Sequence, residues 1–413
     1  MSGLRYGALG LPLAFVALPL YVSLPAYYAQ AFDVPLAQLG ALLLFARLVD
    51  AGLDPWIGRA TDAWLAQRRV LVAVLVGAAL LMVAAFAALF FPPAAVRGPA
   101  LLAWAGVMLV LGYTAYSVLT VSHQAWGARL GGNATAQTRV VAWREGASLL
   151  GVLAASVLMS QAGWPVTTAV LGVTLALGLM LLLSLQAPPS PHREPTRWSL
   201  AWRTPAFRKL LAVYAVNGIA AAIPATVLLF YVRDVLQAPQ HEAAFLVAYF
   251  AAAAVSMPLW LRAVARWGQA RAWLLGMGVA VLSFVWAGFL GPGDVTPFLM
   301  VCVASGVAVG ADLAIPAAML TRVVQGAGLA GRAEGAFFGW WNGMSKLNLA
   351  LAAGLALPLL QALGYQEGAR DAGSVRALAQ VYALLPCLLK LAAMALLWKF
   401  FVAAPSRAVL ESR

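Results

Sequence analysis

Long apolar stretches separated by short polar breaks run along almost the whole chain. Twelve of these stretches approach or exceed the ~20 apolar residues that a helix needs to cross a bilayer. They fall at roughly 7–31, 36–64, 70–92, 100–128, 140–162, 165–186, 208–236, 240–264, 272–291, 297–325, 335–363 and 376–402. The pattern predicts an all-α membrane protein with twelve transmembrane helices, the first of which is an uncleaved helix and not a signal peptide.

The longest polar break, Ala187–Arg208, is rich in proline and arginine. It divides the predicted helices into six and six, which indicates an N-terminal six-helix bundle over 1–186, a cytoplasmic linker over 187–207 and a C-terminal six-helix bundle over 208–413. This layout resembles the major facilitator fold, in which two bundles enclose a binding site near the middle of the membrane.

Composition supports lipid as the solvent of this chain. Hydrophobic residues make up 63% of the 413 residues and charged residues 10%, whereas soluble domains are ~45–50% apolar and ~25% charged. The net charge of +13 would suggest a nucleic-acid partner in a soluble protein, but here most of the Lys and Arg residues fall on one side of the predicted helices. By the positive-inside rule that side is cytoplasmic, so we expect both termini in the cytoplasm of a bacterium, a multi-pass protein of the inner membrane and no nucleic-acid partner.

Four basic residues lie inside the apolar segments, namely Arg47, Arg144, Lys346 and Lys390. Arg47 shares its segment with Asp50 and Asp54, and the spacing i, i+3, i+7 places all three on one face of a helix. A charge at membrane depth costs ~2.5–3.5 kcal/mol by insertion scales, so a group of three indicates function.

Two carboxylates one helical turn apart cannot both ionise cheaply in a dry site. Either one of them, Asp50 or Asp54, holds a proton, or a cation or Arg47 compensates their charge. The stretch therefore predicts an ion-coupling site for H⁺ or Na⁺. The alternative is a structural ion pair between Arg47 and Asp50, with Asp54 capping a helix break at Pro55.

The segment RLVDAGLDPWIG, residues 47–58, resembles the R-x-x-D-x-x-x-D-P-x-x-G signature of the glycoside–pentoside–hexuronide:cation symporter (melibiose permease-like) family of the major facilitator superfamily. The resemblance implies that Asp50 and Asp54 are the two cation-site aspartates. Weaker matches imply that Thr114 and Lys346 belong to or neighbour the cation site, and that Arg144 lies near the sugar pocket.

Three positions depart from the family pattern. Ala14 and Ser117 stand where the family carries sugar-binding aspartates, and Leu53 stands where it carries a cation-site asparagine. Without the two aspartates the substrate is not expected to be a melibiose-like galactoside, and an amphipathic substrate fits the less polar pocket. Without the asparagine the coupling ion shifts from Na⁺ toward H⁺.

Further positions have candidate roles. Tyr21, Trp341 and Asn342 are candidate cavity residues. Gly58 and Asp62, followed by two arginines, resemble the G-x-x-x-D…R-R loop of major facilitator proteins, in which the aspartate caps a helix end and helps to hold the cytoplasmic gate shut; the alternative is a solvated loop. We expect Asp312 to neutralise Lys346, and we expect Arg144 and the adjacent Glu145 to face different directions.

Other motifs carry no chemistry. The GxGxxG at 326–331 follows no predicted strand and is expected to be a loop, and the three histidines are scattered. With no nucleophile–base pair or metal cluster, we predict a non-enzyme without a cofactor other than the coupling ion.

The predicted function is cation-coupled symport of a small organic solute by alternating access, by a monomer in the lipid bilayer. Two alternatives stay open, a lysolipid or amphiphile transporter or flippase, and a non-transporting membrane sensor or assembly partner.

Overall fold

The computed structural model describes residues 2–186, 199–365, 368 and 371–403, and this part of the chain is helical throughout, without a β-strand. Its internal contacts divide it into two compact units. The first unit comprises Met1–Arg203 together with Val324–Gly343, and the second comprises Thr204–Val323 together with Met344–Arg413. The stretch 324–343 thus groups with the first unit, although the sequence-based division placed it in the C-terminal bundle; the six-plus-six division itself stays a prediction.

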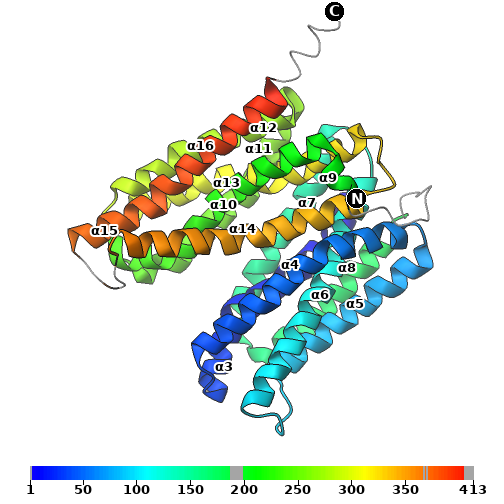
Figure 1. The fold of residues 1–413 in the computed structure, drawn as a ribbon, viewed down its shortest axis with the longest axis horizontal. Helices are drawn as coiled ribbons and strands as arrows, with labels where there is room; N and C mark the ends of the chain where they lie inside the picture. The colour runs from blue at the N-terminus through cyan, green and yellow to red at the C-terminus, as the bar shows by residue number, and fades with distance from the viewer. Residues whose placement is uncertain (1, 187–198, 366–367, 369–370, 404–413) are drawn as a thin grey trace, which may run out of the picture. The chain divides into compact units, whose positions relative to one another are not determined.

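The first unit consists of long helices with short connections (Figure 1). In chain order its elements are α1 (Ser2–Gly7), α2 (Gly10–Leu18), the π-helical turn η1 (Pro19–Ser23), α3 (Leu24–Phe32), α4 (Leu36–Leu65), α5 (Arg68–Phe90), α6 (Pro99–Arg129), α7 (Ala134–Gln161), α8 (Gly163–Leu183) and α9 (Leu200–Arg203). Of the predicted linker, 187–198 lies outside the described residues, and α9 occupies part of the remainder.

The second unit continues the helical pattern. Its elements are α10 (Pro205–Phe230), η2 (Tyr231–Val235), η3 (Pro239–His241), α11 (Glu242–Trp267), α12 (Gln269–Phe284), η4 (Val285–Phe289), α13 (Val295–Gly326), α14 (Glu334–Ala362), α15 (Ala372–Ala379), η5 (Gln380–Leu384), α16 (Leu385–Leu397) and η6 (Trp398–Val402). The last residues of α13 and the first ten of α14 belong to the first unit.

Ten helical runs of the described chain are long and apolar enough to cross a membrane, beginning with Arg68–Phe90 and ending with Ala372–Val402. Helix α4 spans 30 residues and carries Arg47, Asp50 and Asp54 within its apolar sequence. Their number, length and composition are those of an all-α, multi-pass membrane protein.

The first predicted helix, 7–31, is not continuous. It is divided into α2, η1 and α3, with Pro19 opening the π-helical turn and Pro25 following it. Proline lacks the N–H that an α-helix needs in its interior, so the ladder of backbone hydrogen bonds is interrupted at both positions. The sequence pattern contained both prolines, but hydropathy alone does not register the interruption.

Candidate ion-coupling site

One face of α4 carries a row of functional candidates. Arg47, Asp50, Asp54, Gly58 and Asp62 succeed one another at intervals of three or four residues, the spacing that aligns side chains on one face of a helix. The three carboxylates are almost fully buried, with exposed fractions of 2% for Asp50, 0% for Asp54 and 3% for Asp62. The row therefore presents three acids to neighbouring helices of the first unit and not to solvent.

Helix α6 supplies partners for Arg47 and Asp50, the N-terminal members of this row. The Ser117 hydroxyl donates a hydrogen bond of 2.7 Å to Asp50 Oδ1, and the Arg47 guanidinium carbon lies 5.7 Å from the centroid of the Tyr113 ring, within range of a cation–π interaction. The structure thus brings Ser117, a predicted substrate-pocket residue, into contact with Asp50, a predicted cation-site residue. Thr114 donates to the Val110 carbonyl oxygen of its own helix at 2.7 Å, which leaves the lone pairs of its oxygen available as a ligand.

From Asp54 to Gly58 the backbone of α4 lies directly against the first turns of α14. A Cβ atom on Gly339 would overlap the Asp54 carbonyl oxygen, and a Cβ on Gly335 would overlap the carbonyl oxygen of Gly58. Glycine is the one residue that permits this approach, and small residues at that spacing commonly bring membrane helices together. The face that carries the acids is thus also the face in closest contact with α14.

At the end of the row, Asp62 binds the first turn of α14. Asp62 Oδ1 accepts the Gly335 N–H at 2.8 Å and Oδ2 accepts the Ala336 N–H at 2.9 Å. Arg129, from the end of α6, donates to Asp62 Oδ1 at 3.0 Å and to Glu334 Oε2 at 2.9 Å, and all three side chains are at most 3% exposed. These N–H groups are among the four that an α-helix leaves without internal partners, so Asp62 acts as an external cap. Asp62 is therefore part of a buried contact between α4, α6 and α14 and not of a solvated loop, and its role in a gate stays a prediction.

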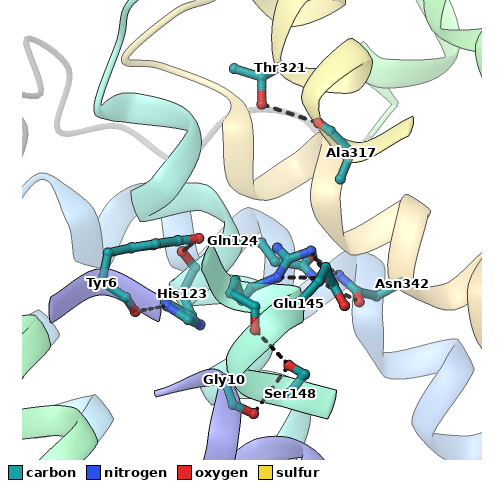
Figure 2. A network of polar contacts seen from close by, with 10 residues as sticks. Tyr6, Gly10, His123, Gln124, Glu145, Ser148, Ala317, Thr321 and Asn342 are labelled. Carbon is teal, nitrogen blue, oxygen red and sulfur yellow. Dashed lines mark hydrogen bonds and ion pairs between the residues drawn. The ribbon is translucent and has the colours of Figure 1, made fainter. Parts of the chain in front are cut away.

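The sequence analysis did not identify Gln124. Its side chain pairs with Asn342, whose Nδ2 donates to Gln124 Oε1 at 2.6 Å (Figure 2). Gln124 follows Ser117 by seven residues on α6, so the same helical spacing that revealed the α4 row would have found it. Trp341, the other candidate on this turn of α14, is buried, with 4% of its surface exposed.

Arg144 does not face away from Glu145, as its adjacency suggested. Its Nε and Nη2 both donate to Glu145 Oε1, with the Nε–Oε1 distance 3.0 Å. Two long side chains can fold toward each other even when their Cβ atoms diverge. Beside them, Ser148 donates to the Gly10 carbonyl oxygen at 3.2 Å (Figure 2), which joins α7 to α2.

Another buried contact joins α1 to α6 near this group. His123 Nε2 lies 2.8 Å from the Tyr6 carbonyl oxygen, and the Tyr6 hydroxyl donates back to the His123 carbonyl oxygen at 3.0 Å (Figure 2). This reciprocal arrangement is structural, and the described residues contain no group of three or more His, Cys, Asp or Glu side chains able to hold a metal ion.

The remaining candidates are dispersed. Ala14 is half-buried on α2, and the side chain of Tyr21 lies outside the described residues. Lys346 is half-buried on the part of α14 that belongs to the second unit. Asp312 does not pair with Lys346 in the described structure. Its Oδ2 accepts a hydrogen bond of 2.7 Å from Lys390 on α16, because Lys390 is the intramembrane cation that packing brings beside it.

The fold is similar to those of solved transporters. A bacterial homologue of the iron transporter ferroportin, solved in an outward-facing state, aligns with a TM-score of 0.72 at 17% identity and covers 97% of this chain and 98% of that chain. FucP, a Major Facilitator Superfamily transporter solved in the outward conformation, aligns with a TM-score of 0.70 at 13% identity and the same coverage. Identities this low establish the fold alone. No curated protein matches the chain.

The sequence itself matches a family model. The model describes MFS/sugar transport proteins, and the match runs over residues 5–403. That span includes every helix that the structure describes from α2 to η6. The chain belongs to this family, and is a multi-pass membrane transporter and not an enzyme.

Proposed function

We propose that this transporter couples the movement of a small organic solute to a cation, H⁺ or Na⁺, that binds at Asp50 and Asp54. The observation that carries the proposal is the burial of both carboxylates on one helix, 2% and 0% exposed and one turn apart. Two carboxylates one helical turn apart in a dry site repel each other when both are ionised, and a proton or a metal cation that binds there lowers the cost of enclosing the acids away from water.

The neighbouring groups suit this role. The Ser117 hydroxyl donates a hydrogen bond to Asp50, and hydroxyl oxygens such as those of Thr114 and Ser117 are ligands that a small hard cation accepts. The cation-site resemblance of the 47–58 segment agrees with this assignment. Lys346 as a tuning cation and Arg144 as a substrate-binding residue stay predictions.

The contact between α4 and α14 gives the coupling site a route to conformational change. Asp54 contributes its side chain to the cation site and its backbone oxygen to the contact with Gly339. We infer that the Asp62–Arg129–Glu334 cluster is a gate contact on the cytoplasmic side, with both chain termini on that side of a bacterial inner membrane. Cation and solute are coupled if both favour the same arrangement of this contact, and such coupling is reciprocal.

The experiment measures cation binding before the solute is known. The purified chain is heated in NaCl, LiCl and choline chloride at equal ionic strength and at two pH values. We expect its unfolding midpoint to rise with Na⁺ or Li⁺, or to depend on pH without them if the ion is H⁺. The Asp50→Asn and Asp54→Asn variants lose that response. Asp371→Asn, an exposed acid of the second unit, keeps it.

Transport is tested with the same variants in proteoliposomes. Under imposed Na⁺ or H⁺ gradients the chain is screened against labelled sugars, organic acids and lysolipids. Gradient-driven uptake that is undiminished in both Asp→Asn variants contradicts the proposal. Lysolipid movement that ignores every ion gradient favours the amphiphile flippase instead.

A further inference from the structure

The second unit contains a partly open cavity that is lined by its own residues and is not part of the candidate ion-coupling site. Its volume is about 150 Å³, and its wall is formed by α10, α11, α12, α13, η5 and α16. Most of the wall is alanine, leucine, valine and phenylalanine. The polar or reactive side chains among the lining residues are those of Tyr249, Cys302, Ser305, Tyr382, Cys387 and Lys390.

The one charged residue of the wall is held in a neutral pair. Lys390 donates to Asp312 Oδ2 at 2.7 Å, while Asp312 Oδ1 accepts the Trp273 indole N–H at 2.7 Å and the Asn217 amide N–H at 3.1 Å. Three donors on one carboxylate hold the Asp312 side chain in a fixed position. The pair therefore contributes no net charge to the cavity.

Lys390 nevertheless keeps hydrogen-bonding capacity at the wall. An ammonium has three N–H groups, and among the described residues Asp312 is the acceptor for Lys390. Ser305 has no such capacity as a donor, because its hydroxyl donates to the Val301 carbonyl oxygen of its own helix at 2.7 Å. The cavity thus offers N–H donors beside an aromatic and aliphatic wall.

These properties select a class of ligand. A cavity of about this volume accepts one benzene-sized molecule. An ion entering it would bring an uncompensated charge into an apolar site, at a high cost in free energy. We propose that the cavity binds an uncharged organic compound the size of one ring, with an acceptor oxygen that receives a hydrogen bond from Lys390 and a ring that packs on Tyr249 and Tyr382. This site is independent of the cation site proposed for the first unit.

The chain carries its own reporters of occupancy. It contains two cysteines, Cys302 and Cys387, and both line this cavity. Alkylation of each thiol by N-ethylmaleimide is followed by mass spectrometry on the full chain in detergent, with benzyl alcohol as the probe ligand. We expect benzyl alcohol to slow the reaction of both thiols and to reach saturation, whereas equal concentrations of benzoate and benzylammonium leave the rates unchanged.

Variants separate a hydrogen-bonded site from simple partitioning into detergent. Lys390→Met alone would strand the Asp312 charge, so it is combined with Asp312→Asn, which keeps the site neutral. The concentration of benzyl alcohol for half-protection should rise about tenfold or more in this double variant, the effect of losing a hydrogen bond from a charged donor. Ala225→Phe fills the cavity from an exposed position of its wall and should abolish saturable protection. This variant tests the site if the double variant does not fold.

Several results would overturn the proposal. They are the absence of protection by benzyl alcohol, equal protection by benzoate, and unchanged half-protection in the variants. If neither thiol reacts in the native chain, binding of benzyl alcohol is measured by equilibrium dialysis in the same detergent, and the absence of saturable binding overturns the proposal.

Discussion

Replacing Asp62 by asparagine tests the capping contact on α14 directly. The substitution keeps the size of the side chain but removes its charge and one of its two acceptor oxygens. The native carboxylate accepts two backbone N–H groups at 2.8 and 2.9 Å and one from Arg129 at 3.0 Å. An asparagine side chain has one acceptor oxygen, so its NH₂ group would occupy the place of the second carboxylate oxygen and face a donor N–H group.

The expected cost follows from these contacts. Breaking a buried ion pair by removing one partner costs ~3–5 kcal/mol, but Arg129 retains Glu334 at 2.9 Å, so part of the loss is avoided. A hydrogen bond to a charged group is worth ~1.5–3 kcal/mol. We therefore expect a loss of about 2–4 kcal/mol at the first turn of α14, which corresponds to roughly a 30- to 900-fold increase in local opening at 1.36 kcal/mol per factor of ten.

Hydrogen exchange of the peptide that covers 331–340 measures this opening. In Asp62→Asn the amides of Gly335 and Ala336 should exchange at least about 30-fold faster than in the native chain. Asp371→Asn is the matched control, since Asp371 caps α15 by accepting the Ser374 N–H at 3.0 Å but is exposed; exchange in 331–340 should not change in that variant. Native exchange rates at Gly335 and Ala336 in Asp62→Asn would refute the assignment of Asp62 as the cap of α14.

Three further predictions concern single contacts. Ser117→Ala removes the hydroxyl that donates to Asp50 at 2.7 Å, so the cation concentration for half-maximal thermal stabilisation should change about tenfold or more, and an unchanged value would exclude the hydroxyl from the site. Gly339→Ala should destabilise the first unit by ~1–3 kcal/mol through overpacking, whereas Gly40→Ala, with open space around its Cβ position, should not; denaturant unfolding of both variants decides this. Because a backbone N–H donates to it, the pKa of Asp371 lies below its ordinary value of 3.8, so the α15 cap is complete above that pH and is lost as the pH falls through the lower folded value. Exchange of the capped amide as a function of pH tests this sign.

Much of the architecture follows from periodicity and hydropathy, because lipid forces every backbone polar group into a helix. The alignment of Arg47, Asp50, Asp54 and Asp62 on one face follows equally from helical geometry, since it needs no knowledge of neighbouring helices. The partners that these side chains find on other helices could not be predicted in this way. Arg129 stands at the end of α6, where the positive-inside rule gives it a sufficient explanation, and its contacts with Asp62 and Glu334 depend on packing across 67 and 205 residues of sequence.

The pairing of Asp312 shows the same limit. The sequence placed two lysines at membrane depth, Lys346 and Lys390, and nothing in spacing or hydropathy chooses between them. Neutralisation of a buried acid was a sound expectation, but the identity of the partner depends on which helix packs beside α13. In the structure that helix is α16, and the partner of Asp312 is Lys390.

The contrast between the two buried acid sites argues for different roles. In the second unit, Asp312 is balanced by Lys390 and held by two further donors, so the cost of its burial is already offset and a further cation would add unfavourable charge. On α4, two buried carboxylates lie one turn apart on one face, and a proton or metal cation bound there would reduce their mutual repulsion. We therefore infer that ion coupling belongs to the first unit, and that the cavity of the second unit is suited to an uncharged molecule.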